Sequence, residues 1–144
     1  MFYGTIIEFF SLIFKNNKMK YKTALLVDDD ADSNFVNSWI VRKEFAEEVI
    51  VKQSAENALE YLKKRSKNRD ELPDVIFLDI RMPIMDGFDF LEEYNKLPDL
   101  VKSKCKIIML SSSFDKNDYH KAIGNQFVYR YLNKPLTIEA LADI

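Results

Sequence analysis

Acidic, hydroxyl and lysine side chains follow the apolar runs of this sequence, in a pattern that suits chemistry on phosphate. Asp28 and Asp29 come directly after the run TALLV, and Asp79 ends the run DVIFLD. Ser111 follows KIIML, and Lys134 follows the last such run. If these runs are parallel strands of one sheet, their carboxyl ends share an edge and the side chains lie together.

Such a set has a chemical logic. Carboxylates packed together repel one another, and a divalent cation relieves that repulsion. A site made only of oxygen ligands suits Mg²⁺, which readily accepts a phosphate oxygen as a further ligand. A carboxylate can also act as the nucleophile on phosphorus and form an aspartyl phosphate. A lysine ammonium and a serine hydroxyl could then stabilise the charge on the transferring group.

Each of these residues also has a simpler interpretation when it is taken alone. An aspartate after a strand is often only the cap of the next helix, and Asp30 or Asp32 could serve in this way. The serines at 111–113 would make an ordinary loop, and Lys134 before a proline would be an ordinary solvated lysine. The convergence of four strand ends on one chemistry favours a functional site.

The elements that must position these residues alternate along the chain. Short apolar runs predict strands at 23–28, 48–52, 74–79, 106–110 and 127–132. Helices are predicted at 32–45, 54–62, 87–97, 115–123 and 136–144, with Ser54 and Asp115 as caps. In the first helix, Phe35, Val36, Trp39 and Ile40 recur at the spacing of an apolar stripe. Alternation of this kind predicts an open parallel α/β sheet with right-handed crossovers.

Composition limits the classes of protein that fit. A chain of 144 residues that is 47% hydrophobic and 31% charged suits one domain with a sizeable core. A net charge of −2 leaves no basic excess for a phosphate backbone, so direct nucleic-acid binding is not expected. One cysteine excludes an internal disulfide and a multi-cysteine zinc site, which is typical of a reducing compartment.

The first 20 residues differ from the rest of the chain. Residues 2–14 are strongly apolar apart from Glu8, and residues 15–20 are basic and polar. The apolar run is shorter than the roughly 20 residues of a membrane span, and the charge follows it rather than preceding it as in a signal peptide. Three interpretations remain open: a helix that packs on the domain, a helix that packs on a twin, or a domain that begins at Met19. We therefore treat residues 1–20 as an extension and 21–144 as the domain.

Four segments carry a resemblance to a known family. They are LLVDDD at 25–30, DVIFLDIRMPIMDGFDFL at 74–91, IIMLSSS at 107–113 and YLNKPLT at 131–137. From Lys22 to Ile144 the chain resembles the receiver domain of bacterial two-component response regulators, of the stand-alone type found in chemotaxis. This resemblance implies a flavodoxin-like (βα)5 fold with helices on both faces and strand order 2-1-3-4-5.

The resemblance also implies roles for the residues at the strand ends. Asp79 would be the phosphoacceptor. Asp28, Asp29, Asp79 and the backbone carbonyl of Arg81 would hold Mg²⁺. Lys134 would contact the phosphoryl group and would precede Pro135 through a cis peptide bond.

Further residues would transmit the signal. Ser111 would be the switch hydroxyl, although Ser112 and Ser113 leave that assignment ambiguous, and Tyr131 would be the aromatic side chain that turns inward. Gly87 would let the chain turn sharply after the active-site loop. The surface that changes would include Tyr119, Phe127, Tyr129 and Tyr131, and simple core packing is an equal interpretation of Tyr129. Arg81 and Ser113 would tune how fast the phosphoryl group is lost.

The same resemblance implies partners and location. We expect a histidine kinase or a histidine phosphotransfer protein as donor and an unidentified protein downstream. A homodimer through helix 115–123, strand 127–132 and the last helix is a further expectation. The protein would be a cytoplasmic signalling domain without membrane insertion and not an enzyme, apart from autophosphorylation by small donors and slow self-dephosphorylation.

Two other functions fit part of the pattern. A binding-only domain would keep the fold without using the acidic set, and failure to bind Mg²⁺ would support it. A small Mg²⁺-dependent aspartyl-phosphate hydrolase would use Asp28, followed by Asp30, in an Asp-x-Asp motif. The phosphorylated aspartate separates the two chemistries, because the hydrolase would modify Asp28 and the receiver Asp79.

Overall fold

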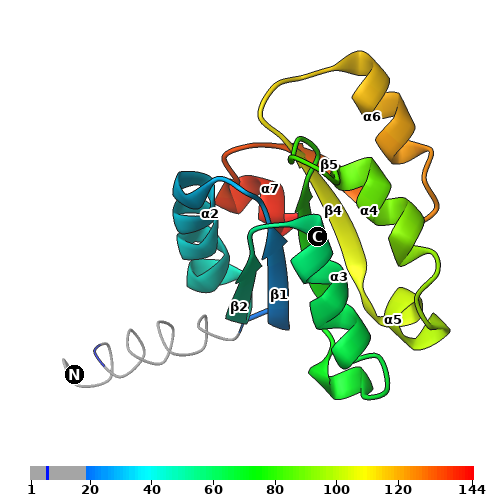
Figure 1. Ribbon diagram of the computed structural model, residues 1–144. Coiled ribbons are helices and arrows are strands. Elements are labelled where there is room, and N and C mark those ends of the chain that lie inside the picture. The colour runs from blue at the N-terminus through cyan, green and yellow to red at the C-terminus, as the bar shows by residue number, and fades with distance from the viewer. Residues whose placement is uncertain (1–5, 7–18) are drawn as a thin grey trace.

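The computed structural model describes Ile6 and residues 19–144, which form one five-stranded sheet with helices on both faces (Figure 1). The strands are β1 (Tyr21–Val27), β2 (Ala46–Lys52), β3 (Val75–Asp79), β4 (Lys106–Ser111) and β5 (Val128–Asn133). Each neighbouring pair is parallel, and the order across the sheet is β2-β1-β3-β4-β5. The predicted fold and strand order are confirmed.

The helices divide between the two faces of the sheet (Figure 1). Helices α2 (Ala31–Glu44) and α7 (Ile138–Ala142) contribute their buried apolar residues to one face. Helices α3 (Ala55–Lys64), α4 (Gly87–Tyr94), α5 (Asp99–Lys104) and α6 (Lys116–Ile123) contribute theirs to the other. A short 3-10 turn, η1 (Arg69–Glu71), leads toward β3.

The central strands are buried on both sides, which explains their continuous apolar runs. Leu25 and Val27 of β1 point into the core beneath α3 and α4, whereas Ala24 and Leu26 point into the core beneath α2. The same alternation continues along β3 and β4. Because all neighbouring strands are parallel, the polar residues that follow them emerge at one edge of the sheet.

Three predicted caps start helices in the structure. The Asp30 carboxylate accepts hydrogen bonds from the backbone amides of Asp32 and Ser33 at 2.9 and 3.3 Å and thereby begins α2. Ser54 begins α3, and Asp115 begins α6, in the same way. Asp30 therefore has a local structural role, and its neighbours Asp28 and Asp29 are left for the strand edge.

Some predicted boundaries are wrong. The helix predicted over 87–97 ends at Tyr94, and the chain turns through a hydrogen bond from the Leu97 amide to the Tyr94 carbonyl at 3.0 Å. Leu97 fits the apolar spacing because it is buried in this turn. Pro98 then caps α5, which was not predicted, and η1 lies in the predicted loop. Strand β5 starts at Val128, not at residue 127.

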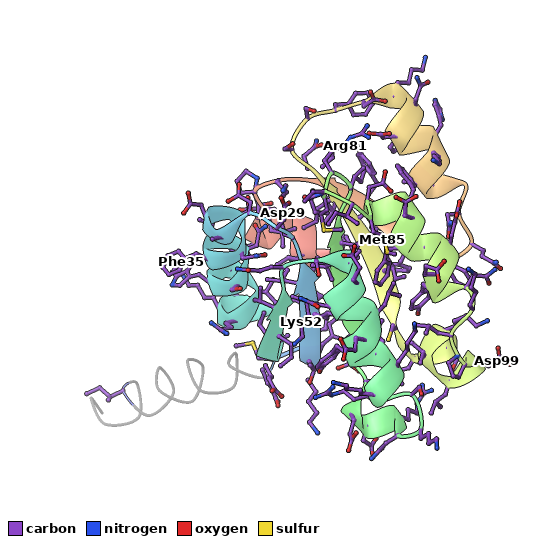
Figure 2. All side chains as sticks on the ribbon, in the orientation of Figure 1. Asp29, Phe35, Lys52, Arg81, Met85 and Asp99 are labelled. Carbon is purple, nitrogen blue, oxygen red and sulfur yellow. The ribbon has the colours of Figure 1, made fainter. Side chains whose placement is uncertain are left out.

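Helix α2 has the predicted position, but three of the four residues of its predicted apolar stripe face outward, and only the fourth, Ile40, packs partly buried against the core. Phe35, Val36 and Trp39 are 77%, 45% and 56% exposed. Figure 2 shows Phe35 projecting away from the body of the molecule. The residues that α2 buries are Asn34, Asn37, Ser38 and Val41.

Hydrogen bonds explain this inversion. The Asn34 side-chain amide donates to the backbone carbonyl of Asp28 at 2.7 Å, and the backbone amide of Leu136 donates to Asn37 Oδ1 at 3.1 Å. The inner face of α2 therefore binds the two chain segments that flank the acidic edge. Amide side chains suit this face because they can both donate and accept hydrogen bonds.

Among the described residues, no helix has both the length and the apolar character to cross a membrane.

Candidate functional site

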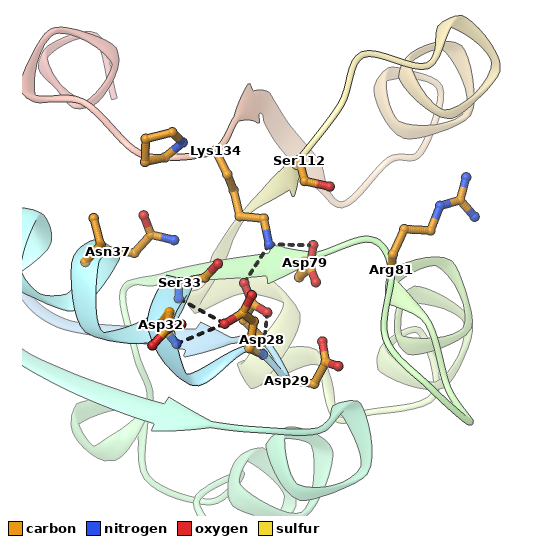
Figure 3. Close-up of a pocket in the computed structure, with 12 residues that line it drawn as sticks. Asp28, Asp29, Asp32, Ser33, Asn37, Asp79, Arg81, Ser112 and Lys134 are labelled. Carbon is orange, nitrogen blue, oxygen red and sulfur yellow. Dashed lines mark hydrogen bonds and ion pairs between the residues drawn. The ribbon is translucent and has the colours of Figure 1, made fainter.

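Three carboxylates meet at the carboxyl edge of the sheet (Figure 3). Asp28 follows β1 and Asp79 ends β3, and both are almost fully buried, whereas Asp29 is exposed. One oxygen of each residue lies within 4.8 Å of the others. The structure thus brings together the three acids that the sequence placed at two different strand ends.

Lys134 joins the two buried acids. Its ammonium lies 2.8 Å from Asp28 Oδ2 and 3.3 Å from Asp79 Oδ1. The Lys134 backbone amide donates to the Ser111 carbonyl at 2.7 Å, which attaches the start of the β5–α7 loop to the end of β4. The Lys134–Pro135 peptide bond is cis, as the resemblance implies.

The electrostatics of the site follow from this arrangement. Burial raises the pKa of the Asp79 carboxyl to about 6, Asp28 adds to the rise, and Lys134 opposes it. Burial acts to lower the pKa of Lys134, but its hydrogen bond to Asp28 and the charge of Asp79 outweigh burial and raise it. Lys134 is therefore a permanent cation, and Asp79 carries a charge that its surroundings stabilise only in part.

The donor set fits a divalent cation. Three carboxylate groups face one ammonium, so the cluster has negative charge in excess when all three acids are ionised. Carboxylate oxygens without sulfur or imidazole are the ligands that suit Mg²⁺. Residues Asp28, Asp29 and Asp79 could hold such an ion.

The site opens into a cavity of about 560 Å³. The ends of β1 and β3, the start of α2 and the two loops after β4 and β5 form its walls. Its lining residues are Asp28, Asp29, Asp30, Asp32, Ser33, Val36, Asn37, Asp79, Arg81, Ser112, Lys134 and Pro135. The acidic cluster is therefore reached from solvent through this cavity.

The serines after β4 take different positions. Ser111 is buried, and its hydroxyl donates to the backbone carbonyl of Ser113 while it accepts from the Ser113 amide at 3.3 Å. Ser112 lines the cavity. The switch role of Ser111 stays a prediction, and Ser112 is the serine with direct access to the cavity in this structure.

Tyr131 lies half-buried beneath α6. Its ring makes an edge-to-face contact with Tyr119, with centroids 5.4 Å apart. Its hydroxyl is buried and has no hydrogen-bond partner among the residues that the structure describes. Tyr129 is 40% exposed, so it faces solvent and is not a core residue, whereas Phe127 packs against the core.

Two further contacts shape the mouth of the site. Arg81, two residues after Asp79, forms an ion pair with Asp118 of α6 and points away from the acids (Figure 3). Gly87 is required by close packing, because a Cβ there would lie 2.7 Å from the Asp79 carbonyl oxygen. The sequence predicted Gly87 for a sharp turn, but no described glycine has a positive φ, and close packing is its role here. The pairing of Arg81 with Asp118 was not predicted, because no local pattern gives a signal for it.

The chain is similar to known proteins along most of its length. The family model described as response regulator receiver domain matches residues 24–144. The chemotaxis protein CheY of Halobacterium salinarum is 29% identical over 126 residues, which cover 85% of this chain and 96% of that protein. The sensor histidine kinase CheAY of Helicobacter pylori is 32% identical over 133 residues, which cover 90% of this chain. The match spans only 15% of the kinase's own length.

A solved structure has the same architecture. The two-component response regulator from Cytophaga hutchinsonii is 33% identical and superposes with a TM-score of 0.80. The match covers 86% of this chain and 93% of that one.

Proposed function

The chain belongs to the response regulator receiver domain family, and on that basis we propose that it accepts a phosphoryl group on Asp79. The observation that carries the proposal is the position of the Asp79 carboxylate. It is buried at the end of β3, 3.3 Å from the Lys134 ammonium and beside two further acids. Domains of this family act in signalling and are not enzymes in the usual sense.

The transfer itself follows from the groups present. A carboxylate oxygen of Asp79 attacks the phosphorus of a phosphohistidine on the donor protein. An O–P bond forms, the P–N bond breaks, and the electron pair stays on the imidazole nitrogen. A raised pKa keeps the Asp79 carboxylate a competent nucleophile, and at neutral pH most of the group is ionised.

The other charges at the edge serve the same step. Receiver domains typically bind Mg²⁺ in an acidic pocket, and Asp28, Asp29, Asp79 and the Arg81 carbonyl would hold it here. When bound, Mg²⁺ supplies positive charge for the phosphoryl oxygens. Lys134 contributes a second cation already held at the acceptor.

The response is a shift between two states of the domain. The new phosphoryl group adds charge and acceptor oxygens next to Lys134 and the serines after β4. Ser111 would leave its contact with Ser113 and donate to the phosphoryl group, and Tyr131 would turn inward. The surface formed by α6, β5 and α7 then changes for a downstream partner or a second copy.

The phosphoryl donor is a histidine kinase or a histidine phosphotransfer protein. The expected location of the domain itself is the cytoplasm. A binding-only domain is the second candidate. The exposed apolar side chains of α2 favour it, because they offer a docking surface that does not depend on phosphorylation. The hydrolase has less support, because both carboxylate oxygens of Asp28 are engaged: Oδ1 accepts from the Asp30 amide at 3.0 Å, and Oδ2 accepts from Lys134 at 2.8 Å.

The test is intact mass after incubation with acetyl phosphate and Mg²⁺, beside an Asp79→Asn control. We expect the wild-type chain to gain one phosphoryl group and the variant to gain none. If Asp79→Asn still gains a phosphoryl group, Asp79 is not the acceptor, and Asp28 becomes the candidate acceptor. If the wild-type chain gains no phosphoryl group from acetyl phosphate or from a phosphorylated histidine phosphotransfer protein, the binding-only function is the better one.

A further inference from the structure

Helix α6 has few apolar contacts with the rest of the domain. Its one fully buried residue is Ala122, and Ile123 at its end is half exposed. Figure 1 shows α6 at the margin of the fold, beyond the loop that follows β4. An element that buries so little apolar surface has low local stability, so each polar contact to the rest of the domain has a large share in its position.

An ion pair between Asp118 and Arg81 joins α6 to the loop after the proposed acceptor. The Asp118 side chain is only 14% exposed, although it belongs to the first turn of a surface helix. Arg81 lies two residues after Asp79 and lines the acidic cavity, but its guanidinium points away from the acids (Figure 3). A cation beside the acceptor is therefore directed at α6.

Asp118 differs from the acid at the same position of another helix. In α4 the third helical residue, Asp89, turns back and accepts from the backbone amide of the cap residue Asp86 at 3.0 Å. Asp118 is the third helical residue of α6, after the cap Asp115, but its carboxylate pairs with Arg81. The carboxylate is thus directed out of its own helix, toward the loop that follows the acceptor.

We propose that the Arg81–Asp118 ion pair holds α6 in its present position and that a phosphoryl group on Asp79 releases it. This inference rests on the proposed function and adds the contact through which the new charge reaches α6. A phosphoryl group carries about 1.5 to 2 negative charges and strong acceptor oxygens, so it competes with the Asp118 carboxylate for the guanidinium. When Arg81 turns toward the phosphoryl group, α6 loses its link to the loop.

Hydrogen exchange of the α6 backbone amides measures the holding contact in the unphosphorylated chain, without Mg²⁺. Arg81→Gln is the main variant, because it changes no residue of α6 and keeps the backbone carbonyl at position 81. It is measured in the wild-type chain and in the Asp118→Asn chain, since an acid in the first turn also stabilises a helix through its dipole. The matched control is Lys116→Gln, which removes a cation from the exposed surface of α6.

We expect Arg81→Gln to speed exchange in α6 about two- to fivefold, as for an ion pair with one exposed partner. In the Asp118→Asn background the same substitution should have no further effect, and Lys116→Gln should not speed exchange. Equal exchange in the wild-type and Arg81→Gln chains would overturn the proposal. An equal increase in both backgrounds would also overturn it, because Arg81 would then not act through Asp118.

The release is measured on the same amides after incubation with acetyl phosphate and Mg²⁺, with Mg²⁺ alone as the reference and intact mass recorded in parallel. We expect phosphorylation to speed exchange in wild-type α6 to about the rate of Arg81→Gln and to add little in that variant. Slow exchange of α6 in a chain that has gained the phosphoryl group would overturn the release. A chain that gains none would remove the proposed function and the release together, whereas the unphosphorylated variants test the holding contact independently.

Discussion

The Lys134 ammonium lies 2.8 Å from Asp28 Oδ2, closer than its 3.3 Å approach to Asp79. The cation is therefore anchored to the acid that is not the proposed acceptor. Asp79 keeps one oxygen in contact with Lys134 while its other oxygen is free of that ion pair. Such an arrangement neutralises part of the buried charge and leaves one carboxylate oxygen of Asp79 available as the nucleophile.

Removal of this cation should make the domain less stable at neutral pH. Lys134→Met would leave Asp28 and Asp79 buried side by side without a counter-charge, at a cost of about 3–5 kcal/mol. Because protonation of one acid relieves the repulsion, much of the loss should return at pH 5. Urea unfolding at pH 5 and pH 8 in divalent-free buffer measures both values. A loss that is equal at the two pH values would contradict the assigned role of the cation.

The Asp79→Asn variant should be more stable than the wild-type chain in the same buffer. The folded state raises the pKa of Asp79 from 3.8 to about 6, so it binds this proton more tightly than the unfolded chain. The contribution of Asp79 to stability therefore falls as the pH rises from about 4 to about 6 and stays low above that range. Since the site is open to solvent, we expect a gain of roughly 1–2 kcal/mol at pH 8.

That gain should disappear in acid. Near pH 3 and below, the wild-type carboxyl is mostly protonated in both states, so the two chains should differ little. The check is the difference in unfolding free energy between the two chains across the pH series. A constant difference would mean that the effect of the substitution is not electrostatic.

Replacement of Asp74 should change the stability of the domain with pH in the opposite sense to replacement of Asp79. Burial acts to raise the pKa of Asp74, but hydrogen bonds from Lys104 and from the backbone amides of Lys22 and Thr23 lower it overall. Because the pKa of Asp74 is lower in the folded state than in the unfolded chain, the ionised group stabilises the fold at pH values above its ordinary pKa. This stability is lost as the pH falls below about 4. Asp74→Asn should cost about 1 kcal/mol at pH 7 and little at pH 3, measured by thermal or urea unfolding.

Replacement of Gly87 by a residue with a side chain should destabilise the domain. In Gly87→Ala the new Cβ would meet the Asp79 carbonyl oxygen at 2.7 Å and the Ile80 Cα at 3.0 Å. Both neighbours belong to the backbone around the acceptor, so relief requires movement of the site, at about 1–3 kcal/mol. Gly124→Ala is the matched control, because its nearest contact is 3.2 Å at the end of α6. Equal losses in unfolding free energy for the two variants would contradict this account.

The sheet and its acidic edge were predictable because both follow from short-range rules. A strand buried on both faces is a continuous apolar run, and the residues after parallel strands share one edge. Asp28, Asp79 and Lys134 meet for that reason, although Lys134 is 106 residues from Asp28. The caps at Asp30, Ser54 and Asp115 follow equally local rules.

The features that could not be predicted depend on contacts between segments that are distant in the sequence. Asn37 is buried because the Leu136 amide, 99 residues away, needs an acceptor, and this contact turns the apolar stripe of α2 outward. Asp118 meets Arg81 only because α6 lies next to the loop after β3. Helix α5 has six residues and one fully buried side chain, so it produces no periodic signal.

The double-sided burial of the sheet has a mechanical consequence. Leu26, Phe77 and Ile108 lie side by side in one core, whereas their chain neighbours Leu25, Ile76 and Ile107 lie in the other. The sheet therefore divides the buried side chains into two separate clusters. Asp79 ends the central strand β3, whose residues alternate between the two clusters, so the proposed phosphoryl group would be added at a point that borders both.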